Sequence, residues 1–255
     1  MEIEQRIERE KQFHDRRYGD GNQRKQQVGK FYSITGSITK AYKEKVLANS
    51  KNSEAIEYGC GEGSYAVKIA KSNAKKVTGI DISPVALENA RKQAELANVE
   101  GNIDFKIANA EHLELEFDSN SQDLIFGSGI LHHLDLDLAV ESIVQTLKPD
   151  GKAIFLEPLG HNFLINLYRR LTPNIRSEDE HPLLSKDLKA IASNFQQSRV
   201  SYFYLTSLGA SLIAGKPGFK LLFGICSFID SILLKIPGIK QQAWMVLIEL
   251  EQPIK

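Results

Sequence analysis

Three glycines alternate with other residues in the stretch "EYGCGEGSY", at Gly59, Gly61 and Gly63. Glycine tolerates positive φ and has no Cβ, so a loop with this spacing lets the backbone approach a ligand closely. An acidic residue, Asp81, follows at the end of the apolar run "VTGID". A carboxylate at the end of the second strand of such a unit accepts hydrogen bonds from both hydroxyls of a ribose. Together the two features predict a site for an adenosine-containing ligand.

The glycine spacing separates two classes of nucleotide site. A dinucleotide fingerprint is G-x-G-x-x-G/A, but the sixth position counted from Gly59 is Ser64, and the third glycine comes one residue early. The spacing therefore counts against a pyrophosphate ligand. An NAD(P)-dependent oxidoreductase remains an alternative, because it would share the parallel sheet and the ribose carboxylate.

Strand-like and helix-like runs alternate from Glu54 onward. The expected strands are "EAIEY", "KVTGI", "NIDFKIA", "DLIFG" and "KAIFLE", and the expected helices span 65–72, 84–98 and 136–147. Ser83 is the expected N-cap of the second helix, with Pro84 in its first turn. This alternation predicts βαβ units and a parallel sheet with helices on both faces. The ligand site is then expected beyond the carboxyl ends of the strands.

With these motifs, from about Glu54 to Glu157, the chain resembles the class I S-adenosylmethionine-dependent methyltransferases that act on small molecules. The resemblance implies a Rossmann-like three-layer sandwich with a mostly parallel seven-stranded sheet and an antiparallel last strand. It also implies S-adenosyl-L-methionine as the cofactor and in-line displacement of its methyl group. The cofactor-binding residues that it implies are Glu57, Gly59, Gly61, Gly63, Asp81, Ile82, Asn109, Ala110, Glu111 and Ser128.

The resemblance gives these residues separate roles. The glycine loop would lie against the methionine part of the cofactor, and Asp81 would bind the ribose. In "ANAEHL", Asn109 stands where the family usually has Asp, and its side-chain amide can still accept a hydrogen bond from adenine. Ser128, in "FGSGILHHL", lies in the segment that touches the cofactor. A non-catalytic methyltransferase-like partner subunit remains a second alternative, although its glycine loop would typically be degraded, and this one is intact.

The regions outside this core are expected to bind the acceptor. Residues 1–50 are interpreted as a helical N-terminal lid, and residues 51–255 as the methyltransferase domain with a substrate-cap insertion at about 158–196. Tyr18, Phe31 and Tyr32 are candidates to line the acceptor pocket. A purely structural N-terminal helix is equally compatible with the sequence.

The catalytic candidates follow the fifth strand, which carries them to the cofactor edge of the sheet. They are Glu157, His161 and His181; the alternative is a solvated salt-bridge network. His161, Asp179, Glu180 and His181 lack a known metal-ligand spacing, so no metal site is expected. The adjacent pair His132 and His133 does not share a face on a helix or strand, so capping or core hydrogen bonds are expected there, with substrate contact as the alternative.

Composition limits the partners. Lys plus Arg and Asp plus Glu both number 32, so the net charge is zero and no nucleic-acid partner is expected. The charged N-terminus lacks the apolar core of a signal peptide, and there are two cysteines, which favours the cytoplasm. The apolar stretch 218–238 is expected to be a crossover helix packed on the sheet. Since it is apolar on more than one face, we expect it to meet an apolar metabolite or lipid acceptor, a homodimer partner or a membrane surface.

Overall fold

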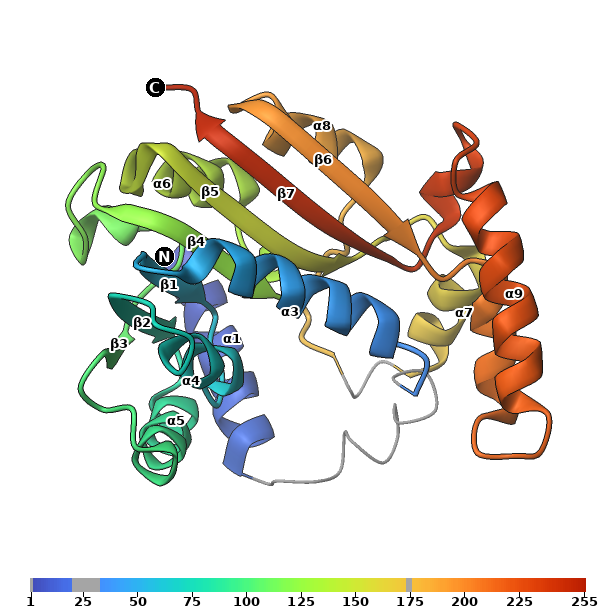
Figure 1. Cartoon of the computed structure of the whole chain (residues 1–255), viewed down its shortest axis with the longest axis horizontal. Helices are drawn as coiled ribbons and strands as arrows, with labels where there is room; N and C mark the ends of the chain where they lie inside the picture. Colours follow the sequence, from blue (N-terminus) through green and yellow to red (C-terminus); the bar gives the residue numbers. More distant parts are fainter. Residues whose placement is uncertain (1, 20–32, 173–175) are drawn as a thin grey trace.

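The computed structural model describes residues 2–19, 33–172 and 176–255. Seven strands form one sheet in the order β3-β2-β1-β4-β5-β7-β6 (Figure 1). The first five strands are parallel, and β7 runs antiparallel to both of its neighbours, β5 and β6. This confirms the expected mostly parallel sheet with an antiparallel last strand. The strands are β1 (Glu54–Tyr58), β2 (Lys76–Asp81), β3 (Ile103–Ile107), β4 (Gln122–Ser128), β5 (Leu147–Pro158), β6 (Phe195–Phe203) and β7 (Met245–Pro253).

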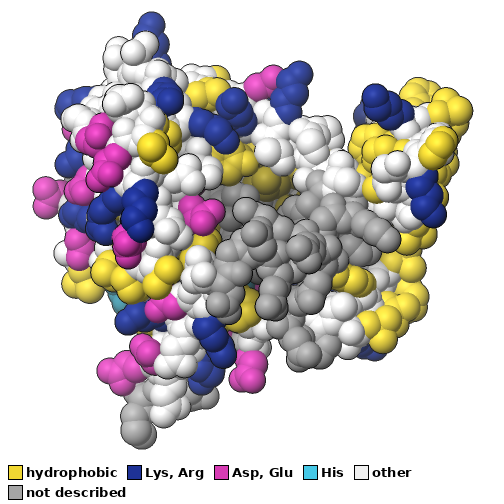
Figure 2. Space-filling view, turned by 90° about the horizontal axis from the view of Figure 1, so that it is seen from below, with side chains coloured by type: hydrophobic (Ala, Val, Ile, Leu, Met, Phe, Trp, Pro, Cys, Tyr) yellow, Lys and Arg dark blue, Asp and Glu magenta, His cyan; other side chains and the backbone are white. Residues whose placement is uncertain are grey.

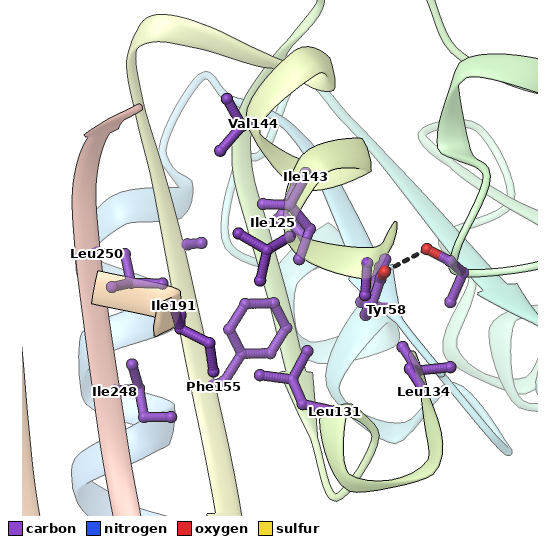
Figure 3. Packing of buried hydrophobic residues seen from close by; sticks show 14 of the residues in the cluster. Tyr58, Ile125, Leu131, Leu134, Ile143, Val144, Phe155, Ile191, Ile248 and Leu250 are labelled. Atoms are coloured by element: carbon purple, nitrogen blue, oxygen red, sulfur yellow. Dashed lines mark hydrogen bonds between the residues drawn. The ribbon is translucent and has the colours of Figure 1, made fainter. Parts of the chain in front are cut away.

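Helices cover both faces of the sheet and make it the middle of three layers. Neighbouring residues of β1 point to opposite faces, because Ala55 belongs to one buried cluster and Ile56 to the other. Figure 3 shows the second cluster, in which Ile143 and Ile191 from two helices approach Phe155 of β5. The first face carries α3 (Gly36–Ser50), α4 (Ser64–Ala70) and α5 (Pro84–Ala97), and the second carries α6 (Leu136–Thr146) and α8 (Ser185–Ala192).

Capping residues fix where two of these helices begin. The Ser83 hydroxyl accepts a hydrogen bond from the Ala86 amide at 3.1 Å, so α5 begins at Pro84 as expected. Asp135 accepts from the amides of Asp137 and Leu138 and begins α6 in the same way. Both caps lie near the edge of the sheet where the glycine loop ends β1.

The described part of the segment expected to be a lid contains helices α1 and α3, and they differ in their surroundings. The helix α3 packs on the sheet through Ile38, Tyr42 and Val46, which are fully buried. By contrast, α1 (Glu2–Gly19) is joined to the body by ion pairs, including Arg9 with Asp179 at 2.8 Å. Of the described residues in 1–50, α1 is therefore the part that matches a covering element, and the division into two domains stays a prediction.

The helix α9 (Phe219–Leu233) does not pack on the sheet, and this corrects the expected crossover helix. Figure 1 shows α9 at one end of the molecule, beyond the ends of β6 and β7. The physical reason is that β6 and β7 are antiparallel neighbours, so the chain between them need not cross a face of the sheet. No helix among the described residues is both long and apolar enough to cross a bilayer.

Candidate active site

A cavity of about 400 Å³ lies at the carboxyl ends of β1, β2 and β4, the edge at which parallel sheets bind ligands. Its size falls in the usual range for small-molecule sites. Part of its wall consists of residues expected to bind the cofactor, namely Gly59, Asp81, Ile82, Asn109, Ala110, Glu111 and Ser128. The other three expected residues, Glu57, Gly61 and Gly63, are not part of the described wall.

The glycines of the loop after β1 have conformations that other residues adopt at a cost. Their φ angles are 66° at Gly59, 51° at Gly61 and 70° at Gly63. A Cβ on Gly59 would lie 2.7 Å from the Ile130 side chain, and one on Gly63 would lie 2.9 Å from Phe105. The loop therefore needs all three glycines for its own shape, and Gly59 also brings bare backbone to the cavity wall.

Asp81 has a fixed carboxylate at the end of β2. One oxygen accepts from the Gly61 amide at 2.8 Å, and the other accepts from the Ser83 amide at 2.9 Å. Burial raises the pKa of Asp81, against these two hydrogen bonds, which favour the ionised form. Because each carboxylate oxygen has two lone pairs, both oxygens keep the capacity to accept one further hydrogen bond on the cavity wall.

Glu57 holds the glycine loop from the side that faces away from the cavity. Its carboxylate accepts from the Ala66 amide at 2.7 Å, in the first turn of α4, and the residue is buried. Burial raises the pKa of Glu57 to about 8. This side chain shapes the loop and does not reach the cavity itself.

The loop after β3 is held by contacts of its own. The Tyr58 hydroxyl donates to the backbone oxygen of Ala110 (Figure 3), and the Asn109 side-chain oxygen accepts from the Glu111 amide at 3.0 Å. Glu111, although on the wall, binds Arg6 of α1 at 2.6 Å and the Asp135 amide at 2.6 Å. Glu111 therefore serves mainly to hold α1 in place.

The three expected catalytic side chains are not among the described residues that line the cavity, and their catalytic role stays a prediction. Glu157 is fully buried and accepts from the amides of Ile130 and Leu131, each at 2.9 Å. The His161 ring accepts from the Ser185 amide at 2.9 Å, at the start of α8, while the His181 ring is exposed. Glu157 lies behind His132 within β5, the His161 ring is bound at the start of α8, and the His181 amide donates to the His132 backbone oxygen at 2.8 Å.

Two adjacent histidines make the buried hydrogen bonds expected of them and also line the cavity. His132 Nδ1 lies 2.7 Å from a Glu157 oxygen, and His133 Nδ1 lies 3.1 Å from a Glu10 oxygen of α1. Both rings line the same cavity from Leu131–His133, a single turn of 3₁₀ helix directly after β4. The signal in the sequence was the position of "ILHHL" directly after β4.

Burial and charge act in opposite directions on the Glu10 and His133 pair. Burial tends to raise the pKa of Glu10, but its contacts with His133 and His14 lower that pKa below its ordinary range. Burial lowers the pKa of His133, against the carboxylate beside it. The pair therefore combines an ionised carboxylate with an imidazole that gives up its proton easily.

Metal-ligand atoms also come together here. Glu10, His14 and His133 offer ligand atoms within 4.8 Å of one another, as do His132, His133 and Glu180. The four residues considered in the sequence do not form such a group, because they have separate partners: Asp179 pairs with Arg9 at 2.8 Å and Glu180 pairs with Arg176 at 2.9 Å.

Apolar and aromatic side chains also line the cavity, beside the charged Arg169, Arg176 and Glu180. These apolar and aromatic side chains include Ile165 and Tyr168 of α7 (Phe163–Leu171) together with Trp244 and Met245 at the start of β7. Tyr18 of α1 lies on the wall beside the glycine loop. Phe31 and Tyr32, also expected near the acceptor, lie outside the described residues.

The protein family described as "Methyltransferase domain" matches residues 49–200. This range holds the glycine loop, Asp81 and the histidine turn, and it covers more than half of the chain. The chain belongs to this family. The glycine loop, Asp81 and the histidine turn of this methyltransferase domain all lie between β1 and β5.

Relatives of this methyltransferase domain act on different small molecules, according to their names. The 27-O-demethylrifamycin SV methyltransferase of Amycolatopsis mediterranei is 33% identical over 98 residues, which cover 38% of this chain and 35% of the relative. The ubiquinone/menaquinone biosynthesis C-methyltransferase of Rickettsia felis is 37% identical over 112 residues, 42% of this chain and 44% of the relative. The chain thus spans less than half the length of these two curated relatives.

A solved structure shares the fold of this methyltransferase domain. The geranyl diphosphate C-methyltransferase of Streptomyces coelicolor A3(2), in complex with Mg²⁺, geranyl diphosphate and S-adenosyl-L-homocysteine, has a TM-score of 0.62 at 15% identity. The match covers 84% of this chain and 80% of the other. At this identity the likeness concerns the fold.

Proposed function

We propose that the protein is an S-adenosylmethionine-dependent methyltransferase with a small-molecule acceptor. The observation that carries this proposal is Asp81, which lies on the cavity wall beside the glycine loop and keeps hydrogen-bonding capacity on both oxygens. Membership of the methyltransferase domain family supports the same conclusion. An NAD(P)-dependent oxidoreductase has no support from these relatives.

The wall fits S-adenosylmethionine residue by residue. Asp81 would hold the ribose hydroxyls, Ile82 would flank the adenine, and Asn109 would accept from the adenine amine. Gly59 and Ser128 would leave room for the amino-acid part. When bound, the cofactor would supply a methyl group activated by its attachment to a sulfonium.

The chain itself would contribute positioning and the exclusion of water. The helix α1 supplies one wall of the cavity and is held there by Arg6 on Glu111 and by Arg9 on Asp179. Holding two reactants in line is worth roughly 7–11 kcal/mol at best, more than an acid or base supplies. We therefore propose a reaction that requires no metal.

His132 is the proposed proton acceptor for an acceptor nucleophile that has a proton to lose. Its Nδ1 faces the Glu157 carboxylate, which only accepts hydrogen bonds, so Nδ1 carries the hydrogen and Nε2 keeps its lone pair. Glu157 is fixed in turn by the Ile130 and Leu131 amides. Glu157 is thus a positioning residue that acts through His132, which revises the role expected from its place after β5.

The proposed acceptor is apolar in part, as a quinone, a polyketide or a prenyl compound is. Ile165 and Met245 add apolar surface to the cavity wall, and Tyr168 adds an aromatic ring. The names of the relatives, which include a ubiquinone/menaquinone methyltransferase, are compatible with this class. Because Cys60 and Cys226 are both free, we place the reaction in the cytoplasm.

Calorimetry with S-adenosylhomocysteine tests the cofactor assignment. Asp81→Ala is expected to lose about 1.5–3 kcal/mol of binding free energy, the range for hydrogen bonds to a charged group. Asp104→Ala is the matched control, since Asp104 is an exposed carboxylate on the neighbouring strand β3. Equal affinity of the wild type and the Asp81→Ala variant would refute the assignment.

An acceptor screen tests the rest of the proposal. The wild type would be incubated with labelled S-adenosylmethionine and a panel of quinones, polyketides and prenyl phosphates, with mass analysis of the products. A labelled product from an apolar member of this panel is the expected result. With a nucleic acid and a protein added to the same panel, methylation of only one of these two would contradict the acceptor class.

A further inference from the structure

The outer face of α9 carries a continuous row of exposed apolar side chains. Leu221, Ile225, Phe228 and Ile232 follow the spacing of one helical face, and Leu221 and Phe228 are 72% and 68% exposed. Figure 2 shows hydrophobic side chains gathered at the end of the molecule where α9 stands in Figure 1. A single exposed leucine is ordinary, but a row of this kind marks a contact surface.

A second row of exposed apolar side chains lies on α7. In α7, Phe163, Leu164, Leu167 and Leu171 are all exposed, while Ile165 points inward and is buried. Figure 1 shows α7 at the same end of the molecule as α9. We call the exposed apolar residues of α7 and α9 together the apolar end.

Buried polar contacts hold α9 in a fixed position. The Asp230 carboxylate accepts from the amides of Leu205 and Thr206 at 3.0 and 2.7 Å and from the Ser207 hydroxyl at 2.6 Å. On the inner side of the helix, Phe219 and Phe223 pack against the core. The outer row is therefore presented in a fixed orientation.

The exposed charges around α9 are positive, which favours an anionic partner. All residues from 206 to 244 are described, and their exposed charged side chains are lysines: Lys216 and Lys220 near the start of the helix and Lys235 after its end. The single acidic residue of this range, Asp230, is buried. In a two-fold dimer the same patch meets itself, so these lysines would face lysines with no carboxylate between them. Anionic lipid headgroups complement such a surface.

We propose that the apolar end docks the protein onto the surface of an anionic lipid bilayer, with α9 lying in the interface. The helix has 15 residues, so at 1.5 Å per residue it is about 22 Å long. This is shorter than the roughly 30 Å hydrocarbon core, and both ends of the helix are basic. An amphipathic helix with these properties binds in the plane of the headgroups.

The docked surface adjoins the wall of the cavity. The inward residues of α7, Ile165 and Tyr168, line the cavity, while its outward residues belong to the apolar end. An acceptor dissolved in the lipid would thus reach the cavity past a single helix. This last step rests on the proposed function, whereas the docking does not.

Flotation with vesicles tests the docking. The full chain would be mixed with vesicles of phosphatidylcholine alone or with added phosphatidylglycerol, and its partition coefficient measured. Phe228→Ser/Ile232→Ser is expected to lower the coefficient tenfold or more, since burial of one such side chain corresponds to about tenfold. Leu96→Ser/Leu115→Ser is the matched control, because these leucines are 86% and 78% exposed but lie outside the apolar end. Lys220→Gln/Lys235→Gln should weaken the preference for phosphatidylglycerol, about fivefold per lysine, and leave the contribution of Lys216.

The opposite outcomes are distinct. Failure of the wild type to bind either vesicle, or wild-type partition of the Phe228→Ser/Ile232→Ser variant, overturns the proposal. A dimer seen by light scattering without lipid, and lost in that variant, would assign the surface to a second copy of the chain and also overturn it. S-adenosylhomocysteine binding by the variant reports that it is folded. Absence of such binding in the wild type would refute the proposed cofactor and leave the docking result intact.

Discussion

Two neighbouring histidines of the cavity bind carboxylates from different elements, one from the sheet and one from α1. His132 is held by Glu157 of β5, a fully buried carboxylate that two backbone amides also bind. His133 is held by Glu10, which comes from α1, an element joined to the body by side-chain ion pairs. The sheet side of the site is thus built into the core, while the other side depends on a helix that polar contacts keep in place.

This difference predicts that the sheet side of the site carries out the chemical step and that α1 encloses the cavity. A proton acceptor on the sheet side keeps its orientation whether or not α1 is bound. The α1 side contains groups that water reaches, since the Arg9 side chain is 48% exposed. Changes on the sheet side should therefore alter the rate of the chemical step, and changes on the α1 side should alter binding.

The largest effect is expected from His132→Ala. Loss of a general base typically lowers kcat by about 10²–10⁴-fold, and S-adenosylhomocysteine affinity should change little because the cofactor wall is intact. Steady-state kinetics and calorimetry on the same preparation measure both quantities. His112→Ala is the control, since His112 also pairs with a carboxylate, Glu114, but at the surface. Unchanged kcat in His132→Ala would remove the assigned base.

A smaller loss of kcat, about 10–100-fold, is expected from Glu157→Gln. The amide can still accept from Ile130 and Leu131, but its NH₂ group cannot accept the hydrogen of His132 Nδ1, so the tautomer is no longer fixed. The pH profile of kcat should shift while KM stays near the wild-type value. A normal pH profile together with reduced thermal stability would reduce Glu157 to a structural role.

On the α1 side, Arg6→Ala should raise KM for the cofactor about tenfold with little change in kcat. The variant leaves the buried Glu111 carboxylate without its cation, at a cost of about 1.5–3 kcal/mol to the docking of α1. Arg16→Ala is the control on the same helix, because Arg16 bonds only the backbone oxygen of Gln12 among the described contacts. If kcat falls as strongly as in His132→Ala, chemistry and enclosure are not separate.

The sheet side should also make stability depend on pH through Glu57. Its folded-state pKa of about 8 lies above the ordinary value of 4.5, so the folded state binds the extra proton between these values. The free energy of unfolding should then fall as pH rises from about 4.5 to 8, by up to roughly 1.4 kcal/mol per unit. In urea melts, Glu57→Gln should flatten this dependence. Parallel curves for the two proteins would place the proton elsewhere.

The smallest effect, no change, is expected from removal of divalent metal ions. Glu10 and His132 already have partners in His133 and Glu157, so the reaction should continue after dialysis against a chelator. Recovery of lost activity by one specific divalent ion would contradict this. It would assign Glu10, His14 and His133 to a metal site that bridges the two sides.

The parts of the site that the sequence predicted depend on local geometry or on fixed sheet topology. The glycines at 59, 61 and 63 need positive φ, and Asp81 ends a strand whose place in the sheet follows from the βαβ order. The contact of His132 with Glu157 joins residues 25 positions apart, through a 3₁₀ turn that no periodic pattern announces. Glu10 meets His133 only because α1 docks, which local sequence does not encode.

The same distinction explains the apolar stretch at 218–238. Its composition correctly predicted a helix with more than one apolar face. The assumption that it crosses the sheet was wrong, because the antiparallel pairing of β6 with β7 is a long-range property. Asp230 holds α9 in place through the Leu205 and Thr206 amides, but in the sequence it only interrupts an apolar run.

The order of strands has a consequence for biosynthesis. The strand β6 is hydrogen-bonded in the described sheet to β7 alone, and β7 lies between β5 and β6. On the ribosome the five strands β3-β2-β1-β4-β5 can pair as they emerge, but β6 has to wait with both edges open until residues 245–253 have been made. The cofactor half of the molecule can therefore assemble during translation, whereas the half that holds α9 needs β7 to complete its sheet.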